Sequence, residues 1–295
     1  MNTQAGQYII GIDGGGSGCR VAIATPQMSI LAITSGGPAN PATDPDAAVS
    51  NLTTALETAR QQATLAPADI AAARAYVGLA GVQDAVSARR IRDALPIDAP
   101  IVSEDRAATL AGALGDRPGS LAALGTGSFV AHLARPGAGP RFVGGWGLQI
   151  GDQASGAWLG RALLTQALLA AEGVAETTPL LRQALGDFAS DASQLAAFAR
   201  AASPAAFARY APRIVAAAGA ADPAGCSLMQ AGVDYLVSAL RSLGHRDSDP
   251  LCLTGGLGPH YAPFLPADLR ANLQPPRGSA LDGALFLAAR QQAPA

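Results

Sequence analysis

The sequence predicts an α/β protein built from two related halves. Segments with the apolar pattern of strands, such as residues 8–13 and 74–79, are separated by segments of helical period, such as residues 85–94. Strand–helix alternation of this kind is typical of α/β layer folds. A strand, a glycine-rich turn and a second strand open the chain, and the same order returns after residue 120. This recurrence predicts a duplicated fold in which each half offers a turn to one shared ligand.

The first half begins with the glycine-rich turn, which joins two strands. Arg20 and Ala22 alternate with Val21 and Ile23 after it, and this is the period of a strand. A dinucleotide-binding fingerprint would have a helix there, so the sequence disfavours a Rossmann fold. Strands are expected at 8–13, 19–24, 74–79 and 101–103, and helices at 46–65, 85–94 and 106–114, the last ended by Gly115.

The second half repeats the strand, turn and strand and then becomes mainly helical. Strands are expected at 121–124, 129–133 and 251–254, helices over most of 157–243 with breaks at Gly173, Pro179, Pro204 and Pro223, a turn at 255–258, and a helix at 280–290. We expect one domain over residues 1–117, joined by the C-terminal helix at about 280–295, and a second over 118–279.

The composition excludes several kinds of chemistry. All 20 basic residues are arginine, so no P-loop lysine, Schiff-base lysine or protein-kinase strand lysine exists. Any phosphate must be held by backbone amides, metal and arginine. The three cysteines are widely separated, which favours neither disulfides nor a cysteine metal site. His132, His245 and His260 show no metal-ligand spacing, so structural roles are expected for them.

Charge and hydropathy restrict the partners. A formal net charge of -2 without an arginine-rich stripe argues against binding nucleic acid. No signal-peptide pattern and no apolar run of bilayer length occurs, so we expect a cytoplasmic protein without a membrane partner. A homodimer is compatible with the sequence, which carries no direct signal of oligomeric state.

The two glycine turns are candidate phosphate sites. Their backbone amides, with the hydroxyls of Ser17, Thr126 and Ser128, could bind an anion without lysine. Asp13 ends the strand before the first turn and could hold Mg²⁺ through water. Alternatively, its carboxylate accepts hydrogen bonds from the turn amides.

Asp105 follows a strand and precedes a helix, which leaves two roles open. It is either the N-cap of that helix or a general base, because ligands of α/β sheets gather at the carboxyl ends of strands. Arg20 and Arg106 are the arginines nearest to the expected phosphate and base positions, and a ligand role is open for both.

Residues 144–156 form the most unusual segment. Its glycines permit close backbone approach to a ligand, and Asp152 adds a carboxylate before the following helix. Trp146 could stack on a sugar face, or its indole could be buried in a tight loop. A further turn, Gly37-Pro38-Ala39-Asn40, ends in an amide that could bind hydroxyls.

Together these motifs resemble the superfamily of acetate and sugar kinases, Hsp70 and actin, and within it the BadF/BadG/BcrA/BcrD ATPase family. Residues 11–17 resemble the first phosphate motif, residues 124–128 the second, and residues 253–257 the adenosine motif. The resemblance covers essentially the whole chain and is strongest to glucosamine and N-acetylglucosamine kinases. It implies a two-domain ribonuclease H-like fold with the nucleotide in the interdomain cleft.

The resemblance also implies roles for individual residues. Asp105 would be the base that accepts the proton of the sugar 6-hydroxyl, and Asp13 would act near Mg²⁺ while ATP supplies the phosphoryl group. Phosphate binding is implied for Gly14, Gly15, Gly16, Ser17, Thr126, Gly127 and Ser128, adenosine binding for Gly255, Gly256 and Leu257, and sugar binding for Asn40, Asp105, Gly145, Trp146 and Asp152. Trp146 would contribute its indole or only its backbone.

The favoured expectation is an ATP-dependent kinase of a small amino sugar, glucosamine. N-acetylglucosamine is the alternative substrate: Glu104 and Asp152 are carboxylates that would suit a free amine, whereas an acetamido group needs an apolar niche. Gln153-Ala154 stands where related kinases often have Glu-Gly, and the lost carboxylate leaves open how the 2-substituent of the sugar is read. Two other classes remain, an ATPase that activates a partner enzyme and a non-catalytic sugar sensor. The activators hold an iron–sulfur cluster with cysteines that this chain lacks as a pair, and a sensor would not need Asp105.

Overall fold

The computed structural model describes residues 7–291, which form two compact units. Unit 1 comprises Met1–Asp116 and Pro276–Ala295, and unit 2 comprises Arg117–Pro275. Each unit contains one β-sheet with helices, so the α/β class predicted from strand–helix alternation is confirmed. Among the described residues, no helix is both long and apolar enough to cross a bilayer.

Unit 1 is built on a five-stranded sheet of order β3-β2-β1-β4-β5. The first three strands are antiparallel neighbours, and β4 and β5 continue parallel to β1. The strands are β1 (Ile9–Gly14), β2 (Cys19–Ala24), β3 (Ile30–Gly36), β4 (Arg74–Leu79) and β5 (Ile101–Ser103), and the helices are α1 (Pro45–Gln62), α2 (Pro67–Ala71), α3 (Ala85–Ala94), α4 (Arg106–Leu114) and α13 (Ala280–Ala289).

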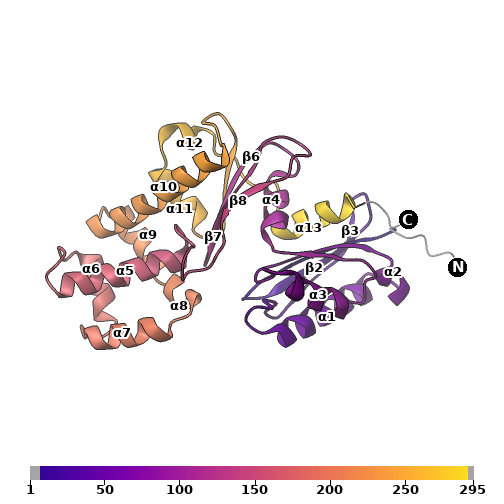
Figure 1. Ribbon diagram of the computed structural model, residues 1–295, viewed down its shortest axis with the longest axis horizontal. Helices are drawn as coiled ribbons and strands as arrows, with labels where there is room; N and C mark the ends of the chain where they lie inside the picture. The colour runs from indigo at the N-terminus through magenta and orange to yellow at the C-terminus, as the bar shows by residue number, and fades with distance from the viewer. Residues whose placement is uncertain (1–6, 292–295) are drawn as a thin grey trace. The chain divides into compact units, whose positions relative to one another are not determined.

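Both faces of this sheet are covered by helices (Figure 1). Successive residues of a strand point to opposite faces. Ile10 therefore packs in a core with residues of α1 and α3, whereas Ile9 packs in a second core with α4 and α13. Helix α13 lies so close to β1 that a Cβ added at Gly11 would be 2.8 Å from the backbone nitrogen of Leu285. The C-terminal helix thus belongs to the core of unit 1.

Unit 2 is built on a four-stranded sheet of order β8-β7-β6-β9 with a large helical layer. The strands are β6 (Gly119–Leu124), β7 (Ser128–Leu133), β8 (Arg141–Gly144) and β9 (Leu251–Thr254). The helices are α5 (Gly156–Ala171), α6 (Pro179–Gly186), α7 (Ala192–Ala201), α8 (Pro204–Ala208), α9 (Ala211–Gly219), α10 (Pro223–Leu243), α11 (Gly258–Tyr261) and α12 (Ala267–Ala271), with a 3₁₀ turn at Ala262–Phe264.

The prolines expected to break this helical region in fact begin its helices. Pro179, Pro204 and Pro223 are the first residues of α6, α8 and α10, where the missing amide hydrogen costs nothing. Each helix is capped by the preceding side chain, of Thr178, Ser203 or Asp222.

The two sheets share one topology, which confirms the predicted duplication. In each, three consecutive strands run antiparallel, and a fourth pairs parallel with the first: β4 with β1, and β9 with β6. A glycine-rich turn joins the first two strands of both sheets. Strands β3 and β8 were not predicted. β3 is an edge strand whose large apolar side chains, Ile30, Leu31 and Ile33, are exposed while Ala32 and Thr34 are buried, so its sequence lacks the apolar-inward, polar-outward pattern of a strand.

Candidate active site

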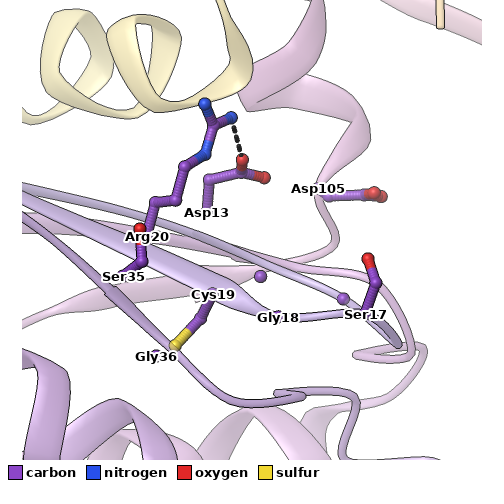
Figure 2. Close-up of a pocket in the computed structure, with 10 residues that line it drawn as sticks. Asp13, Ser17, Gly18, Cys19, Arg20, Ser35, Gly36 and Asp105 are labelled. Atoms are coloured by element: carbon purple, nitrogen blue, oxygen red, sulfur yellow. Dashed lines mark hydrogen bonds and ion pairs between the residues drawn. The ribbon is translucent and has the colours of Figure 1, made fainter. Parts of the chain in front are cut away.

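Unit 1 contains a cavity of about 510 Å³ at the carboxyl end of β1 (Figure 2). Its lining combines the first glycine turn with the residue that follows β5. The ten lining residues are Asp13, Gly14, Gly15, Ser17, Gly18, Cys19, Arg20, Ser35, Gly36 and Asp105. Of the residues predicted from the sequence, Gly16 lies exposed in the same turn but outside the lining.

The first glycine turn is a tight hairpin connection held on several sides. The Gly15 amide donates to the Gly18 carbonyl at 2.9 Å, which closes the turn. The carbonyls of Gly14 and Gly15 accept from the amides of Ala80 and Ala39. The outer residues, Gly16 and Ser17, are exposed, so a rigid turn offers backbone amides and a hydroxyl to solvent. Such a concavity suits an anion.

Asp13 is paired with Arg20 rather than with the turn amides. The two residues lie opposite each other on β1 and β2, and the Arg20 guanidinium donates to Asp13 Oδ2 at 2.6 Å (Figure 2). Cross-strand partners on one face of a sheet are close enough for such a pair. The alternative in which Asp13 binds its own turn is therefore wrong.

The donors in this cavity fit a hard divalent cation. Mg²⁺ prefers carboxylate and hydroxyl oxygens and keeps several waters, and Asp13, Asp105 and Ser17 supply such oxygens on one cavity. Arg20 neutralises Asp13, which favours contact through water over a direct bond.

Asp105 has the features of a base rather than of a helix cap. It occupies the N-cap position of α4, but its side chain accepts no hydrogen bond from the helix. The N-cap alternative is therefore wrong for the carboxylate. Burial raises the pKa of Asp105 to about 6, with smaller contributions from the negative charges of Glu104 and Asp13, against the lowering effect of Arg106. A carboxylate poised near neutral pH suits proton transfer.

The neighbouring Glu104 is occupied by an ion pair. Its carboxylate accepts from Arg106 Nε at 2.6 Å and from a second guanidinium nitrogen of the same side chain. Both side chains are largely shielded from solvent. Arg106 thus neutralises Glu104, whereas the pKa of the adjacent Asp105 stays raised.

Asn40 lies near this cavity without lining it. The Ala39 amide ties its loop to Gly15, and Asn51 Nδ2 donates to the Pro38 carbonyl at 2.7 Å. Asn40 Oδ1 accepts from the Ala42 amide at 2.9 Å, an Asx-type turn that fixes the side chain. Its position in unit 1 is thus set by the first glycine turn.

Unit 2 has a second cavity, of about 420 Å³, at the carboxyl ends of β6 and β9. Because these strands are parallel neighbours, the turns that follow them meet, and the Leu257 amide donates to the Leu124 carbonyl at 3.0 Å. The lining residues are Gly125, Thr126, Gly156, Ala208, Ala211, Pro212, Val215, Gly256, Leu257 and His260. The cavity thus brings together Thr126, Gly256 and Leu257, three of the residues implicated by sequence.

The loop at residues 144–156 folds onto the second glycine turn of unit 2. The Gly145 amide donates to the Ser128 carbonyl at 2.9 Å, and the Ser128 hydroxyl donates to the Gln153 carbonyl at 2.6 Å. A Cβ added at Gly127 would lie 2.9 Å from Asp152 Oδ2, so the Asp152 carboxylate packs directly against this glycine and would have to shift to admit a larger residue. Gly145, Gly127, Ser128 and Asp152 therefore form one cluster, although none lines the cavity.

Asp152 and Trp146 differ sharply in exposure. Asp152 is 6% exposed, accepts weakly from the Gly147 amide at 3.3 Å, and has its pKa raised by burial. The Trp146 side chain is 64% exposed, so the alternative of a buried indole is wrong. Its ring is accessible for stacking on a ligand.

Sequence reasoning missed most of the wall of the second cavity. Ala208 comes from the end of α8, Ala211, Pro212 and Val215 come from α9, and His260 comes from α11. Their spacing is that of one helical face, which indicates burial but not whether a core or a cavity lies beside it. In the first cavity, Ser35 and Gly36 were missed because β3 was not predicted, and Cys19 was missed although its strand, β2, was predicted.

Two of the three histidines, for which structural roles were expected, lie close together in unit 2. His132 on β7 and His245 after α10 lie on either side of Ser120, and both imidazoles hydrogen-bond its hydroxyl. They are distant in sequence, so no spacing rule could reveal the pair. The third, His260, lies in α11 rather than in a loop.

The duplicated sheets, the glycine turns and the cavities at strand ends define a two-unit α/β protein of the actin-like ATPase type. Residues 10–263 match the model of the BadF/BadG/BcrA/BcrD ATPase family, and the chain belongs to this family. The predicted family resemblance is confirmed, and membership implies the use of ATP.

Three relatives align along nearly the whole chain. Glucosamine kinase GspK of Vibrio cholerae is 27% identical over 286 residues, 97% of each protein. A proposed N-acetylglucosamine kinase of Chromobacterium violaceum, known as a crystal structure, is 34% identical with a TM-score of 0.84, covering 97% of this chain and 100% of that one. A proposed N-acetylglucosamine kinase of Porphyromonas gingivalis shares the fold, with 23% identity, a TM-score of 0.69 and coverage of 96% and 99%.

Proposed function

We propose that the chain is an ATP-dependent kinase that transfers the γ-phosphoryl group to the 6-hydroxyl of an amino sugar, with glucosamine as the first candidate. The observation that carries the proposal is Asp105, a partly buried carboxylate that caps no helix, has a pKa of about 6 and lies beside a glycine turn. A phosphoryl acceptor needs a base of this kind for its hydroxyl proton. The names of the Vibrio cholerae and Chromobacterium violaceum relatives support the substrate class.

In unit 1, the proposed roles follow from the lining of the first cavity. Asp105 accepts the proton of the sugar hydroxyl. The turn of Gly14, Gly15, Gly16 and Ser17 binds phosphate: its exposed outer residues, Gly16 and Ser17, donate to phosphate oxygens, and the Gly15 amide closes the turn. Asp13 orients the waters of Mg²⁺, with Arg20 beside it neutralising charge. When bound, Mg²⁺ would stabilise negative charge on the transferring phosphoryl group.

In unit 2, we propose that the second cavity takes the nucleotide. Thr126, with Gly127 and Ser128 of the same turn, would bind phosphate. Gly255, Gly256 and Leu257 would lie along adenosine, where Ala211, Pro212 and Val215 offer an apolar wall to a base. A largely apolar pocket with a few directed polar groups is the usual form of such a site.

The sugar contacts are proposed from the loops near the two turns. Asn40, Gly145, Trp146 and Asp152 would bind it, with the exposed Trp146 indole available to stack on one face. The case for a sugar contact is weaker for Asp152, because its carboxylate faces Gly147 and Gly127 of the surrounding loops.

One observation favours N-acetylglucosamine as a second candidate. An ammonium group on the sugar needs an unpaired carboxylate, but Glu104 is neutralised by Arg106 and Asp152 is buried within its own loop. An acetamido group makes no such demand. The 34% identical Chromobacterium violaceum relative points the same way.

The non-kinase alternatives find less support. A partner-activating ATPase with an iron–sulfur cluster needs accessible cysteines in pairs, whereas Cys19 and Cys252 are buried and Cys226 is isolated from both in sequence. A sugar sensor would have no use for a base whose pKa is raised toward neutrality.

The test is ADP release with Mg-ATP in the presence of glucosamine, N-acetylglucosamine, glucose or N-acetylmannosamine. We expect an amino sugar to raise the rate most, and Asp105→Asn to lower kcat by about 10²–10⁴-fold. Asp191→Asn is the matched control, because Asp191 is a helix cap remote in sequence from both turns. If no sugar raises ADP release above background, the kinase proposal fails.

A further inference from the structure

A buried polar cluster in unit 2 is not part of either cavity. Ser120 is the second residue of β6, and His132 on β7 lies opposite it. His245 follows α10, and Asp249 precedes β9. The side chains of Ser120, His132 and His245 are buried, and Asp249 is 14% exposed. The glycine turn of the proposed nucleotide site follows the opposite end of β6, so the cluster lies away from it.

Ser120 orients both imidazoles. Its hydroxyl oxygen lies 2.9 Å from Nδ1 of His132 and 2.9 Å from Nδ1 of His245. A serine hydroxyl donates one hydrogen, so one imidazole accepts it and the other donates its Nδ1 hydrogen to the same oxygen. The rings are held edge to face, with centroids 6.4 Å apart. Their Nδ1 atoms are thereby engaged.

His245 has a polar atom that the described residues leave unsatisfied. Its Nε2 has no hydrogen-bond partner among the described residues, and the residue is only 8% exposed, so bulk solvent does not reach this atom. A buried nitrogen without a partner costs about 1–3 kcal/mol, so native proteins rarely keep one. This atom therefore points to a ligand that completes the site.

Asp249 brings a carboxylate to the same place. One ligand atom each from His132, His245 and Asp249 can be chosen so that all lie within 4.8 Å of one another. Asp249 Oδ2 accepts from the Arg246 amide at 2.9 Å, which fixes the side chain. Oδ1 lies 3.3 Å from the Arg246 guanidinium, which is 80% exposed and can move into solvent.

We propose that His132, His245 and Asp249 bind a transition-metal ion, Zn²⁺, in a structural site. Two imidazoles and a carboxylate are a ligand set that zinc prefers, with water as the fourth ligand. Tetrahedral zinc with bonds of about 2.0–2.1 Å holds its ligand atoms about 3.3 Å apart, so the three side chains need to close only modestly. Ser120 would act from the second layer, where a partner at the other ring nitrogen fixes the orientation of each ligand.

The ligand set selects against a hard cation. Mg²⁺ and Ca²⁺ take oxygen ligands, whereas the cluster offers one carboxylate beside two imidazoles. Arg141 and Arg246 add positive charge near His132, which weakens the binding of any cation, and the His132 ring also hydrogen-bonds the Gly119 backbone, a contact that metal binding would replace. Imidazole donors suit zinc. The ion would tie the segment between α10 and β9 to the β6–β7 hairpin.

The experiment measures Zn²⁺ binding to the full chain after treatment with a chelator, with Co²⁺ as a spectroscopic probe of the ligands. The wild type should bind one Zn²⁺ per chain. His245→Gln and Asp249→Asn should weaken binding by about 100-fold or more, and Ser120→Ala by about 10–100-fold. His260→Gln is the matched control, since His260 is the remaining histidine of the chain and should leave Zn²⁺ affinity unchanged.

Two readouts separate zinc binding from misfolding. Asp249→Asn changes a partly accessible side chain and keeps its size, so circular dichroism should match the wild type while Zn²⁺ affinity falls. Zn²⁺ should raise the melting temperature of the wild type and of His260→Gln, but not that of Asp249→Asn. If the wild type binds no Zn²⁺, or if all variants bind it equally as an adventitious ion, the site does not exist.

Discussion

Replacing Asp105 by Asn should abolish phosphoryl transfer and also change how stability depends on pH. The pKa of Asp105 rises from 3.8 to about 6 in the folded state, mainly through burial. A raised folded-state pKa means that its stabilising contribution is complete below pH 3.8 and is lost as the pH rises through about 6. Asn does not titrate, so the variant lacks this loss.

The size of the effect follows from the difference in pKa. About two pKa units at about 1.4 kcal/mol each correspond to roughly 3 kcal/mol. The free energy of unfolding of Asp105→Asn, relative to the wild type, should therefore rise by up to about 3 kcal/mol between about pH 4 and pH 7.5. The absolute offset depends on how the new amide is hydrogen-bonded, but the pH dependence does not.

Urea unfolding at a series of pH values measures this difference. Far-UV circular dichroism is the appropriate signal, because both tryptophans, Trp146 and Trp158, lie in unit 2 whereas Asp105 lies in unit 1. Asp191→Asn is an opposite-sign control: the Ser193 amide lowers the pKa of Asp191, so this variant should lose stability relative to the wild type as pH rises. If Asp105→Asn behaves like Asp191→Asn, Asp105 is an ordinary helix cap and the reasoning is refuted.

Two further predictions concern activity. If Asp105 acts as the base, kcat/KM for an uncharged sugar should rise with pH through about 6 and then level off, because only the ionised carboxylate accepts a proton; a flat profile over this range would contradict the assignment. Gly127→Ala should weaken ATP binding about tenfold, since its Cβ would lie 2.9 Å from Asp152 Oδ2 and push the buried carboxylate away from the second turn. Gly139→Ala, with open space around it, should bind ATP normally in the same calorimetric titration.

Much of the fold could be predicted because local signals agree with the tertiary structure. The strands at 74–79 and 101–103 and the helices at 85–94 and 106–114 have the expected bounds, since apolar period, caps and the stop at Gly115 coincide. Strand β3 escaped prediction because its apolar side chains face outward. Alternation of apolar and polar residues predicts a strand only where the apolar side chains face the core.

The candidate site also has features that the sequence could predict and features that it could not. Asp13, Ser17 and Asp105 could be grouped in advance, because glycine turns and strand ends converge at one edge of a parallel arrangement. The residues that pair with them could not be predicted from the sequence. Such pairings depend on side-chain positions that strand register and packing set. They include Arg20 with Asp13, Arg106 with Glu104, and His132 with His245.

The most direct test of the central claim is identification of the product. The wild type, incubated with Mg-ATP and glucosamine or N-acetylglucosamine, should form the sugar 6-phosphate together with an equal amount of ADP, detected by phosphorus NMR coupling to the C6 protons. Asp191→Asn should form the same product and Asp105→Asn essentially none. Hydrolysis of ATP without any sugar phosphate, or full product formation by Asp105→Asn, would contradict the account.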